Sequence, residues 1–188
     1  MHEPKILTSR LDLHHISVDG LIALYEEKND FKAIANRDFS NPLQVLVKEE
    51  GPLAWRVPQV KSNPLLNKWF VRFIVERASQ SVIGSTSFHG EPDSLGMVEI
   101  GIEIDAKFRN QGFAKEALLG MWLWVSQEPQ VKVLRYTVSP DNSPSVAIIK
   151  SFGFRYIGQQ MDEIDGPEDI YELSTAEFLE KWGAGDER

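Results

Sequence analysis

The sequence contains no cysteine, and this absence removes several kinds of chemistry at once. Without cysteine, the chain has no disulfide scaffold, no thiolate nucleophile and no cysteine ligand for a metal. It also lacks any uninterrupted run of about 18 apolar residues, so no membrane-spanning helix is predicted. The first residues, MHEPKILTSRLDL, lack the apolar core of a signal peptide. We therefore expect a cytoplasmic protein with no membrane partner and no bound metal.

An excess of positive charge is also missing. The chain has 28 acidic and 20 basic residues, which gives a net charge of −8 at pH 7. Residues 159–188 hold ten acids and two bases, so this last segment carries the whole imbalance. Because nucleic acids require a basic face, we expect no nucleic-acid partner. The acidic segment is either a solvated surface or a rim that attracts a cationic acceptor.

Length and composition favour one domain. The chain has 188 residues, of which 42% are hydrophobic and 26% are charged, as in an ordinary globular protein. This length suits one substantial core rather than two. Apolar periodicity gives the order strand, two helices, three strands, helix, strand, helix and two strands. The sequence therefore predicts a single domain over residues 1–188 of the α+β class, a sandwich of helices on a mixed sheet.

The clearest periodic patterns adjoin each other. Apolar residues alternate with polar or small ones over residues 97–104, which predicts a strand. Apolar residues then recur with a period of 3.6 over residues 114–125, which predicts an amphipathic helix that ends before Pro129. We place Trp122 and Trp124 of this helix in the core.

The other boundaries depend on caps and helix breakers. We expect Asp19 to cap the first helix and Ser143 to cap the helix before the last two strands. Ser174 and Glu177 have the spacing of a capping box before the final helix. Residues 41–67 contain four of the ten prolines, so we expect a long irregular loop, with at most a helical turn near residues 43–48.

The connection between the periodic strand and helix includes RNQGFA, residues 109–114. A simple connection needs a turn residue and a cap, whereas this one places Gly112 and Ala114 where the helix begins. Small residues leave backbone NH groups accessible, and the helix dipole favours negative charge there. The loop therefore indicates an anionic ligand, and a plain helix-capping loop is the alternative.

The same loop carries a family resemblance. RNQGFA resembles the R/Q-x-x-G-x-G/A signature of the GCN5-related N-acetyltransferase (GNAT) superfamily. One strand later, PDNSPSVAIIKSFGF resembles the N-x-x-S…GF helix of that family. The opening LTSRLDLHHIS is similar to the T-x-R-L-x-L start of the RimJ/RimL branch. The resemblance implies the GNAT fold, with a mostly antiparallel central sheet flanked by helices, and acetyl-CoA as co-substrate.

The resemblance also assigns residues to the binding of acetyl-CoA. The pyrophosphate would be held by the loop, where NH groups of Gln111, Gly112, Phe113 and Ala114 and the charge of Arg109 favour an anion. The pantetheine arm would pair with the backbone of the strand at Ile102 and Ile104, with an NH near Ile104 facing the thioester oxygen. The full set of expected donor-binding residues is Ile102, Ile104, Arg109, Asn110, Gln111, Gly112, Phe113, Ala114, Lys115 and Asn142.

A general base is needed because a protonated amine has no lone pair for attack. We favour Glu99, since this branch often has a carboxylate at that position, and Glu103 lies on the same polar face of the strand. Asp162, Glu163 and His89 are alternatives, and each is also explained as a surface or turn residue. His14 and His15 are assigned structural roles.

One position departs from the family pattern. Many members have a tyrosine seven residues after the asparagine, where it protonates the departing thiolate, but Asn142 is followed at that spacing by Ile149. The RimJ/RimL branch often uses a serine, and Ser145 occupies its place. Asn142 and Ser145 also suit a turn and the first turn of a helix, so a purely structural role is the alternative.

The expected function is transfer of an acetyl group from acetyl-CoA to a primary amine, in a direct attack. The acceptor is either a protein N-terminal α-amine or a small-molecule amine. The alternative is a non-catalytic acetyl-CoA-binding regulatory module of the same fold. A nucleotide-binding enzyme is disfavoured because no G-x-x-x-x-G-K-[ST] occurs. The oligomeric state is left open, with a homodimer as one option.

Overall fold

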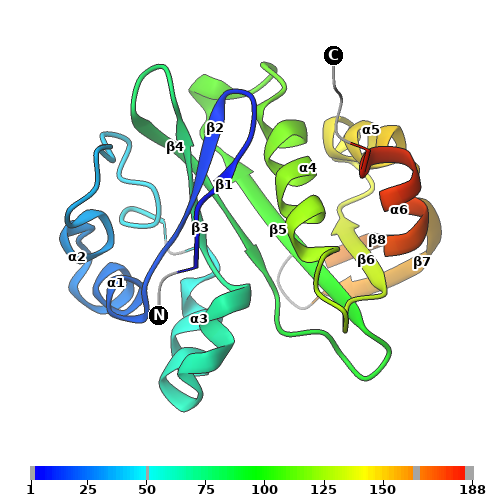
Figure 1. Ribbon diagram of the computed structural model, residues 1–188, viewed down its shortest axis with the longest axis horizontal. Coiled ribbons are helices and arrows are strands. Elements are labelled where there is room, and N and C mark those ends of the chain that lie inside the picture. Colours follow the sequence, from blue (N-terminus) through cyan, green and yellow to red (C-terminus); the bar gives the residue numbers. More distant parts are fainter. Residues whose placement is uncertain (1–2, 50, 163–165, 185–188) are drawn as a thin grey trace. The chain divides into compact units, whose positions relative to one another are not determined.

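The structure, a computed structural model, describes residues 3–49, 51–162 and 166–184 (Figure 1). The strands are β1 (Ile6–Leu7), β2 (Leu11–His15), β3 (Arg72–Glu76), β4 (Ser81–Phe88), β5 (Met97–Ile104), β6 (Val133–Val138), β7 (Arg155–Asp162) and β8 (Gly166–Ser174). The α-helices are α1 (Val18–Ile22), α2 (Phe31–Ile34), α3 (Leu53–Ser62), α4 (Phe113–Val125), α5 (Ser143–Phe152) and α6 (Thr175–Trp182). Shorter helical segments are the π-helical η1 (Ala23–Glu27) and the 3₁₀-helical η2 (Pro64–Trp69) and η3 (Ala106–Phe108).

The described strands form a mixed sheet in the order β1-β2-β3-β4-β5-β6-β8-β7. β5 and β6 are parallel, whereas the pairs β1–β2, β2–β3, β3–β4, β6–β8 and β7–β8 are antiparallel. Helices flank the sheet, so the predicted α+β class with a mostly antiparallel sheet is confirmed. The chain forms two compact units, one of Met1–Glu91 with Gly101–Met121 and one of Pro92–Ile100 with Trp122–Arg188. The single domain over residues 1–188 stays a prediction.

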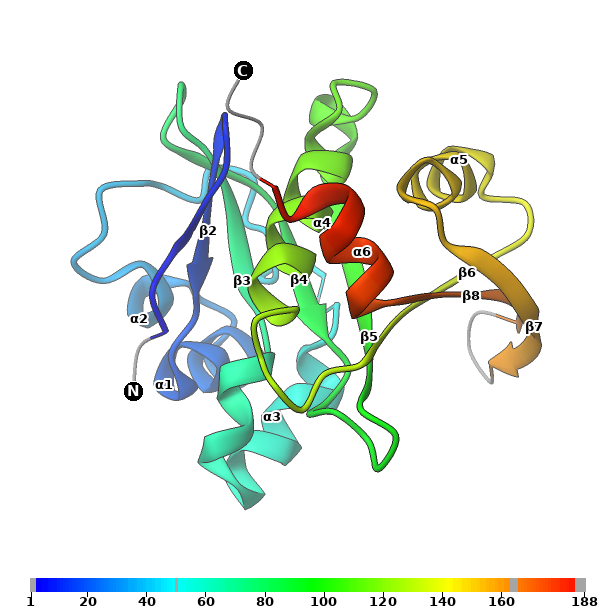
Figure 2. The same cartoon turned by 45° about the vertical axis from the view of Figure 1, so that its right-hand side comes forward.

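Unit 1 contains β1 to β4 and the helices α1 to α3 (Figure 2). Its core is formed by the apolar faces of β2, β3 and β4, where Leu13, Phe73 and Ile83 are completely buried. Burial of such side chains contributes roughly 1.5–3 kcal/mol each. The prediction that Asp19 caps α1 is wrong. Ser17 is the N-cap, because its side chain accepts a hydrogen bond from the Gly20 NH at 3.2 Å.

The segment 41–67 is less irregular than its prolines suggested, because it includes α3 and the start of η2. Leu53, Val57 and Val60 are buried and follow the i, i+4, i+7 spacing of one helical face. Pro58 lies inside α3. Its missing NH removes one hydrogen bond from the helix, and the buried face compensates for this loss. The prediction of a long irregular loop is therefore wrong for the second half of this segment.

Unit 2 has a core of aromatic rings around Trp122, which is completely buried as predicted. The predicted burial of Trp124 is only partial. The ring centroids of Phe154 and Phe152 lie 4.6 and 5.0 Å from that of Trp122. The cap of α5 differs from the prediction, because Asn142 and not Ser143 is the N-cap, with Pro144 in the first turn.

The N-cap half of the capping box predicted at the start of α6 is confirmed, because Ser174 is the N-cap. The Ser174 hydroxyl accepts a hydrogen bond from the Glu177 NH at 3.2 Å, and it donates one to the Glu177 carboxylate at 2.7 Å. The first of these bonds fixes the start of the last helix, since it satisfies an NH group that has no acceptor within the helix.

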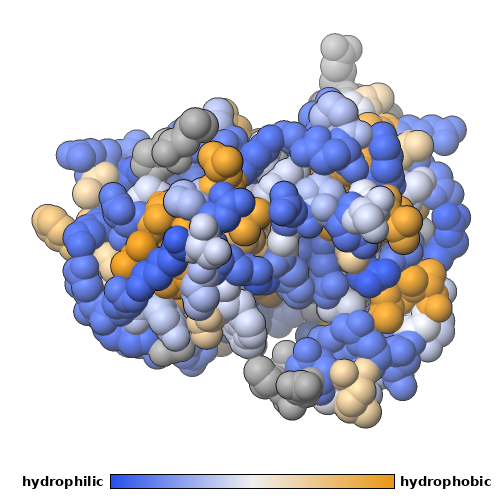
Figure 3. Space-filling view, turned by 90° about the horizontal axis from the view of Figure 1, so that it is seen from below, coloured by the Kyte–Doolittle hydropathy of each residue, from blue (hydrophilic) through white to orange (hydrophobic). Residues whose placement is uncertain are grey.

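The face of the molecule in Figure 3 is mainly hydrophilic, with hydrophobic residues in separate patches. Within the described ranges, no helix is both long and apolar enough to cross a bilayer.

Candidate functional site

The loop between β5 and α4 is short, and its backbone includes two residues in the left-handed region. It opens with η3, where the side chain of Asp105 accepts a hydrogen bond from the Lys107 NH at 2.9 Å. Asn110 and Gly112 follow with φ values of 61° and 81°, in the left-handed region. Glycine adopts this region without strain, whereas a side chain at position 112 would be strained. α4 then begins at Phe113, so the NH groups of its first turn have no acceptor one turn earlier in the helix.

The predicted loop residues differ in what they expose. Arg109, Asn110, Gln111 and Gly112 are exposed, Ala114 and Lys115 are half-buried, and Phe113 is 3% exposed. Phe113 can therefore offer a ligand only its backbone. Arg109 ties the loop to the strand before it, because its Nε donates a hydrogen bond to the Ile104 carbonyl at 2.8 Å.

Sequence reasoning missed a clamp on this loop from the β1–β2 turn. The Glu116 carboxylate accepts hydrogen bonds from the Thr8 hydroxyl and the Arg10 NH, both at 2.6 Å, and from Arg10 Nε at 2.7 Å. Arg10 Nη1 also donates to the Gln111 carbonyl at 3.0 Å. Burial raises the pKa of Glu116, but these hydrogen bonds outweigh it and hold the pKa below its ordinary value. The available signal was the T-x-R motif itself, which sequence reasoning used only to assign a branch.

The end of β5 has backbone features suited to a second segment of ligand. The register described between β5 and β6 covers Met97 to Glu99, the first three of the eight residues of β5. Further along β5, the Gly101 carbonyl accepts a hydrogen bond from the Thr86 hydroxyl of β4 at 2.8 Å. Ile104 is buried as the alternation predicted, whereas Ile102, predicted on the same apolar face, is only half-buried.

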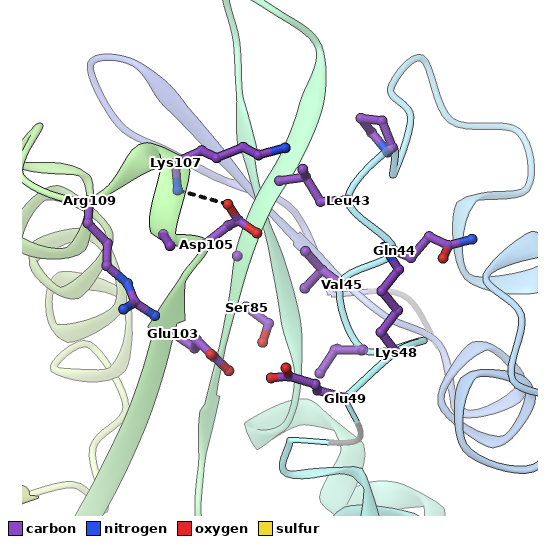
Figure 4. A pocket seen from close by; sticks show the side chains of 14 residues that line it. Leu43, Gln44, Val45, Lys48, Glu49, Ser85, Glu103, Asp105, Lys107 and Arg109 are labelled. Carbon is purple, nitrogen blue, oxygen red and sulfur yellow. Dashed lines mark hydrogen bonds between the residues drawn. The ribbon is translucent and has the colours of Figure 1, made fainter.

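A cavity of about 430 Å³ in unit 1 lies beside this loop (Figure 4). One wall is the segment 42–49, and the opposite wall comes from β4, the end of β5 and the loop after it. The lining carries both signs of charge. Its charged residues are Lys48, Glu49, Glu103, Asp105, Lys107 and Arg109. Figure 4 shows Glu49 and Glu103 extending into the cavity from its two walls.

A smaller cavity of about 180 Å³ shares Ser85 and Glu103 with the larger one. His89 also lines it and packs closely on β5, since its Nε2 would lie 3.3 Å from a Cβ placed on Gly101. The structure therefore brings two of the candidate bases, Glu103 and His89, to the lining of one cavity.

The favoured base, Glu99, lies in unit 2 and is half-buried. Its carboxylate accepts a hydrogen bond from the Thr137 hydroxyl of β6 at 2.5 Å. On the same face, Arg135 pairs with Glu172 through Nε at 2.8 Å. The Thr137 hydroxyl therefore orients the Glu99 carboxylate on this face of the strands. Sequence reasoning did not identify Thr137, because its contact with Glu99 depends on the pairing of two strands.

The two other candidates in unit 2 lie at the start of α5. Asn142 Oδ1 accepts a hydrogen bond from the Ser145 NH at 3.3 Å, which is the N-cap contact. The Ser145 side chain is hydrogen-bonded to the buried Tyr136 hydroxyl, and burial raises the pKa of Tyr136 above its ordinary value. The site therefore has a tyrosine hydroxyl adjacent to Ser145, although position 149 is isoleucine.

The remaining predicted candidates have other surroundings. Asp162 ends β7, and Glu163 lies outside the described residues. His14 is 6% exposed and contacts Phe39 with the two tilted rings 4.5 Å apart between centroids, and burial lowers its pKa to about 4. His15 Nε2 is 2.8 Å from the Asn67 carbonyl. Across the described ranges, no cluster of three or more His, Asp or Glu side chains is arranged to hold a metal.

Three comparisons place this arrangement among known proteins. The family model described as an acetyltransferase (GNAT) domain matches residues 24–155. An uncharacterized N-acetyltransferase, YjdG of Bacillus subtilis strain 168, is 26% identical over 162 residues, which are 78% of this chain and 87% of that protein.

Solved structures share the fold at lower identity. RimL, a ribosomal L7/L12 alpha-N-protein acetyltransferase in complex with coenzyme A, has a TM-score of 0.63 at 16% identity, covering 91% of this chain and 98% of its own. A spermidine N-acetyltransferase SpeG chimera from Vibrio cholerae and hSSAT has a TM-score of 0.62 at 13% identity, covering 91% and 99%.

Proposed function

The chain belongs to the GNAT acetyltransferase family, as its RNQGFA loop predicted, and we propose that it moves an acetyl group from acetyl-CoA to a primary amine. The observation that carries the proposal is the loop before α4. It combines a left-handed Gly112, a helix start and the arginines Arg10 and Arg109. These features suit the pyrophosphate of coenzyme A, because NH groups and guanidinium groups there both favour a polyanion.

The donor would be held at two places along the chain. Arg109 and the backbone of residues 110–115 would bind the phosphates, and the backbone of Ile102 and Ile104 would pair with the amides of the pantetheine arm. Asn142 would add a contact to the same arm.

The reaction would be direct attack in a ternary complex. The amine nitrogen forms a bond to the thioester carbonyl carbon, the carbon–sulfur bond breaks, and the amine proton passes to a base. Glu99 would take that proton, directly or through a water, with Thr137 holding the carboxylate in place. An NH group near Ile104 would stabilise the oxyanion that forms. Ser145, hydrogen-bonded to Tyr136, would donate a hydrogen bond to the departing sulfur.

The acceptor would enter the cavity beside segment 42–49. Glu49, Glu103 and Asp105 offer carboxylates to a cationic amine, and Glu103 is the alternative base because it lines both cavities. A protein α-amine, with a pKa of about 7.7–8.0, needs a weaker base than a lysine-like amine near 10.4. Both a protein N-terminus and a small amine remain candidates, and the named activities of RimL and SpeG include one of each kind.

The test is thiol release from acetyl-CoA in the presence of a panel of peptides and small amines, with mass spectrometry of the acetylated products. We expect acceptor-dependent release. Glu99→Gln should lower kcat about 100-fold or more without changing CoA affinity, and Glu103→Gln should mainly raise the KM for the amine. A larger loss of kcat in Glu103→Gln than in Glu99→Gln would transfer the role of base to Glu103.

The second candidate function is an acetyl-CoA-binding regulatory module that performs no transfer. The replacement of the expected tyrosine by Ile149 favours it. Binding of acetyl-CoA without release on any acceptor, unaffected by Glu99→Gln, would establish this module and overturn the enzyme. Absence of acetyl-CoA binding would overturn both.

A further inference from the structure

We propose that Arg10 is a second arginine of the donor site, which positions the loop before α4 and presents its Nη2 group to the phosphates of coenzyme A. This proposal rests on the proposed function. It adds a residue that lies 99 positions before Arg109 in the chain and outside the signature loop.

The first part of the argument is that Arg10 fixes the start of α4. Its backbone NH and its Nε both donate to the Glu116 carboxylate, at 2.6 and 2.7 Å, and Thr8 donates to the same group. Glu116 is in the first turn of α4, where a negative side chain is also stabilised by the helix dipole. The side chain of Glu116 is only 14% exposed, so this ion pair is partly shielded from solvent.

The second part is that the rest of the guanidinium group lies along the signature loop. Nη1 donates to the Gln111 carbonyl at 3.0 Å, and the guanidinium carbon is 4.4 Å from the centre of the Phe113 ring. A planar guanidinium group makes both contacts at once, whereas the ammonium of a lysine cannot. Arg10 therefore links the β1–β2 turn to the loop at Gln111 and to the first residue of α4, Phe113.

The third part concerns Nη2. Among the residues that the structure describes, no acceptor bonds to it, and it would lie 3.5 Å from a Cβ placed on Gly112. Gly112 has no side chain, so the space next to Nη2 is open to a ligand. Arginine and backbone NH groups together form a typical phosphate contact. The geometry thus leaves one charged donor directed at the place where the proposed pyrophosphate would lie.

The experiment measures CoA affinity by calorimetry for Arg10→Gln, Arg10→Lys and a matched control, Arg155→Gln. The control is chosen because Arg155 is also an exposed arginine paired with a glutamate of a first helical turn, Glu177, at 2.8 Å. We expect Arg10→Gln to raise the Kd for CoA about tenfold and Arg10→Lys about threefold, with Arg155→Gln within about twofold of the wild type.

A second readout separates phosphate contact from a general structural role. Acetyl-pantetheine lacks the nucleotide and its phosphates, so its KM should be the same in Arg10→Gln and wild type, to within about twofold. Thermal unfolding of each variant identifies any that fails to fold, in which case Arg10→Lys carries the test.

Each outcome decides between the two proposals. Wild-type binding of CoA with unchanged affinity in both Arg10 variants would overturn the role of Arg10 and leave the proposed function intact. Equal losses with CoA and with acetyl-pantetheine would also overturn it, since the effect would then be structural. Failure of the wild type to bind CoA would overturn the proposed function instead.

Discussion

Two segments that line the cavity of unit 1 differ in how their shapes are fixed. The loop 105–113 is held by hydrogen bonds with two other elements. Arg109 of the loop donates to the carbonyl at the end of β5, and Arg10 of the β1–β2 turn donates to the Gln111 carbonyl. The segment 41–49 is held mainly by itself. The Asn41 side chain forms hydrogen bonds with both the NH and the carbonyl group of Val45. Gln44 and Leu46 in this turn have left-handed backbone conformations, although neither is glycine.

The difference follows from what each segment is proposed to bind. A pyrophosphate is the same in every donor, so a loop that offers NH groups to it is constrained in sequence and is recognised by its glycine. The acceptor amine differs from one enzyme to another, so the segment that forms the acceptor side of the cavity is not restricted to one sequence. We therefore expect changes in loop 105–113 to act on donor affinity and changes in segment 41–49 to act on the acceptor.

The largest effect should come from Gly112→Val. A β-branched residue at φ 81° is strained, and its side chain would occupy the space beside Arg10 Nη2. We expect the Kd for CoA, measured by calorimetry, to rise about a hundredfold. Gly90→Val is the control, because a Cβ there meets nothing within 4 Å. Equal CoA affinity in the Gly112 variant would show that the loop does not approach the phosphates.

The next prediction concerns how the stability around each segment depends on pH. His14 contacts Phe39, just before segment 41–49, and its folded pKa of about 4 is below the ordinary value of 6.5, first because of burial and then because of Arg37 and Lys5. The unfolded chain therefore binds the proton more readily. The contribution of neutral His14 to the free energy of unfolding is therefore fully present well above pH 6.5. It is lost as the pH falls towards 4, and the loss is about 2 kcal/mol at pH 5.

Denaturant unfolding at pH 7.5 and pH 5 measures this loss. His14→Leu should remove the His14 contribution to the pH dependence, since the ring is buried and its Nδ1 has no partner among the described residues. The Glu116 clamp should persist over this range, because its lowered pKa keeps the carboxylate ionised until the pH falls below its ordinary value. An unchanged pH dependence in His14→Leu would contradict the assignment to His14.

The sequence was sufficient for the elements with strong periodicity. β5, α4 and the loop between them were predicted because each has a local pattern. The predicted end of α5 at Gly153 is also confirmed, because Gly153 is its C-cap with a φ of 100°. α3 was missed because the four prolines of residues 41–67 favoured an irregular loop, although the buried residues of α3 have helical spacing. The caps at Asp19 and Ser143 were wrong by one or two residues, since several neighbouring side chains can cap a helix.

Contacts between distant segments could not be predicted from local patterns. Arg10 meets Glu116 across 106 positions, Thr137 meets Glu99 across 38, and Tyr136 bonds to Ser145. Each pair depends on strand order and register, which the sequence indicates only coarsely. The roles of Glu99 and Ser145 therefore stay predictions.

A smaller effect is expected from Asn41→Ala on the segment 41–49. The Asn41 side chain is buried and makes two hydrogen bonds to Val45, at 2.9 and 3.1 Å. Its removal should lower the free energy of unfolding by about 1 kcal/mol and raise the KM for the amine, with CoA affinity unchanged. Steady-state kinetics and CoA calorimetry check both halves. A change in CoA affinity with no change in acceptor KM would contradict the division between the two segments.

The smallest effect should come from Glu49→Gln, on the far wall of the cavity from Glu103. Loss of one exposed carboxylate should raise the KM for a cationic amine about threefold and leave that for a neutral analogue unchanged, because exposed charges interact weakly. The effect should decrease with added salt. An equal change for both acceptors would show that the carboxylate contributes shape and not charge.

The central claim is that the NH groups at the start of α4 hold the phosphates of the acetyl donor. Hydrogen exchange of the backbone NH groups of residues 111–114, followed by NMR with and without CoA, tests this directly. We predict that saturating CoA slows exchange at these positions, and that acetyl-pantetheine does not. Saturation by CoA with exchange at residues 111–114 unchanged would contradict the account.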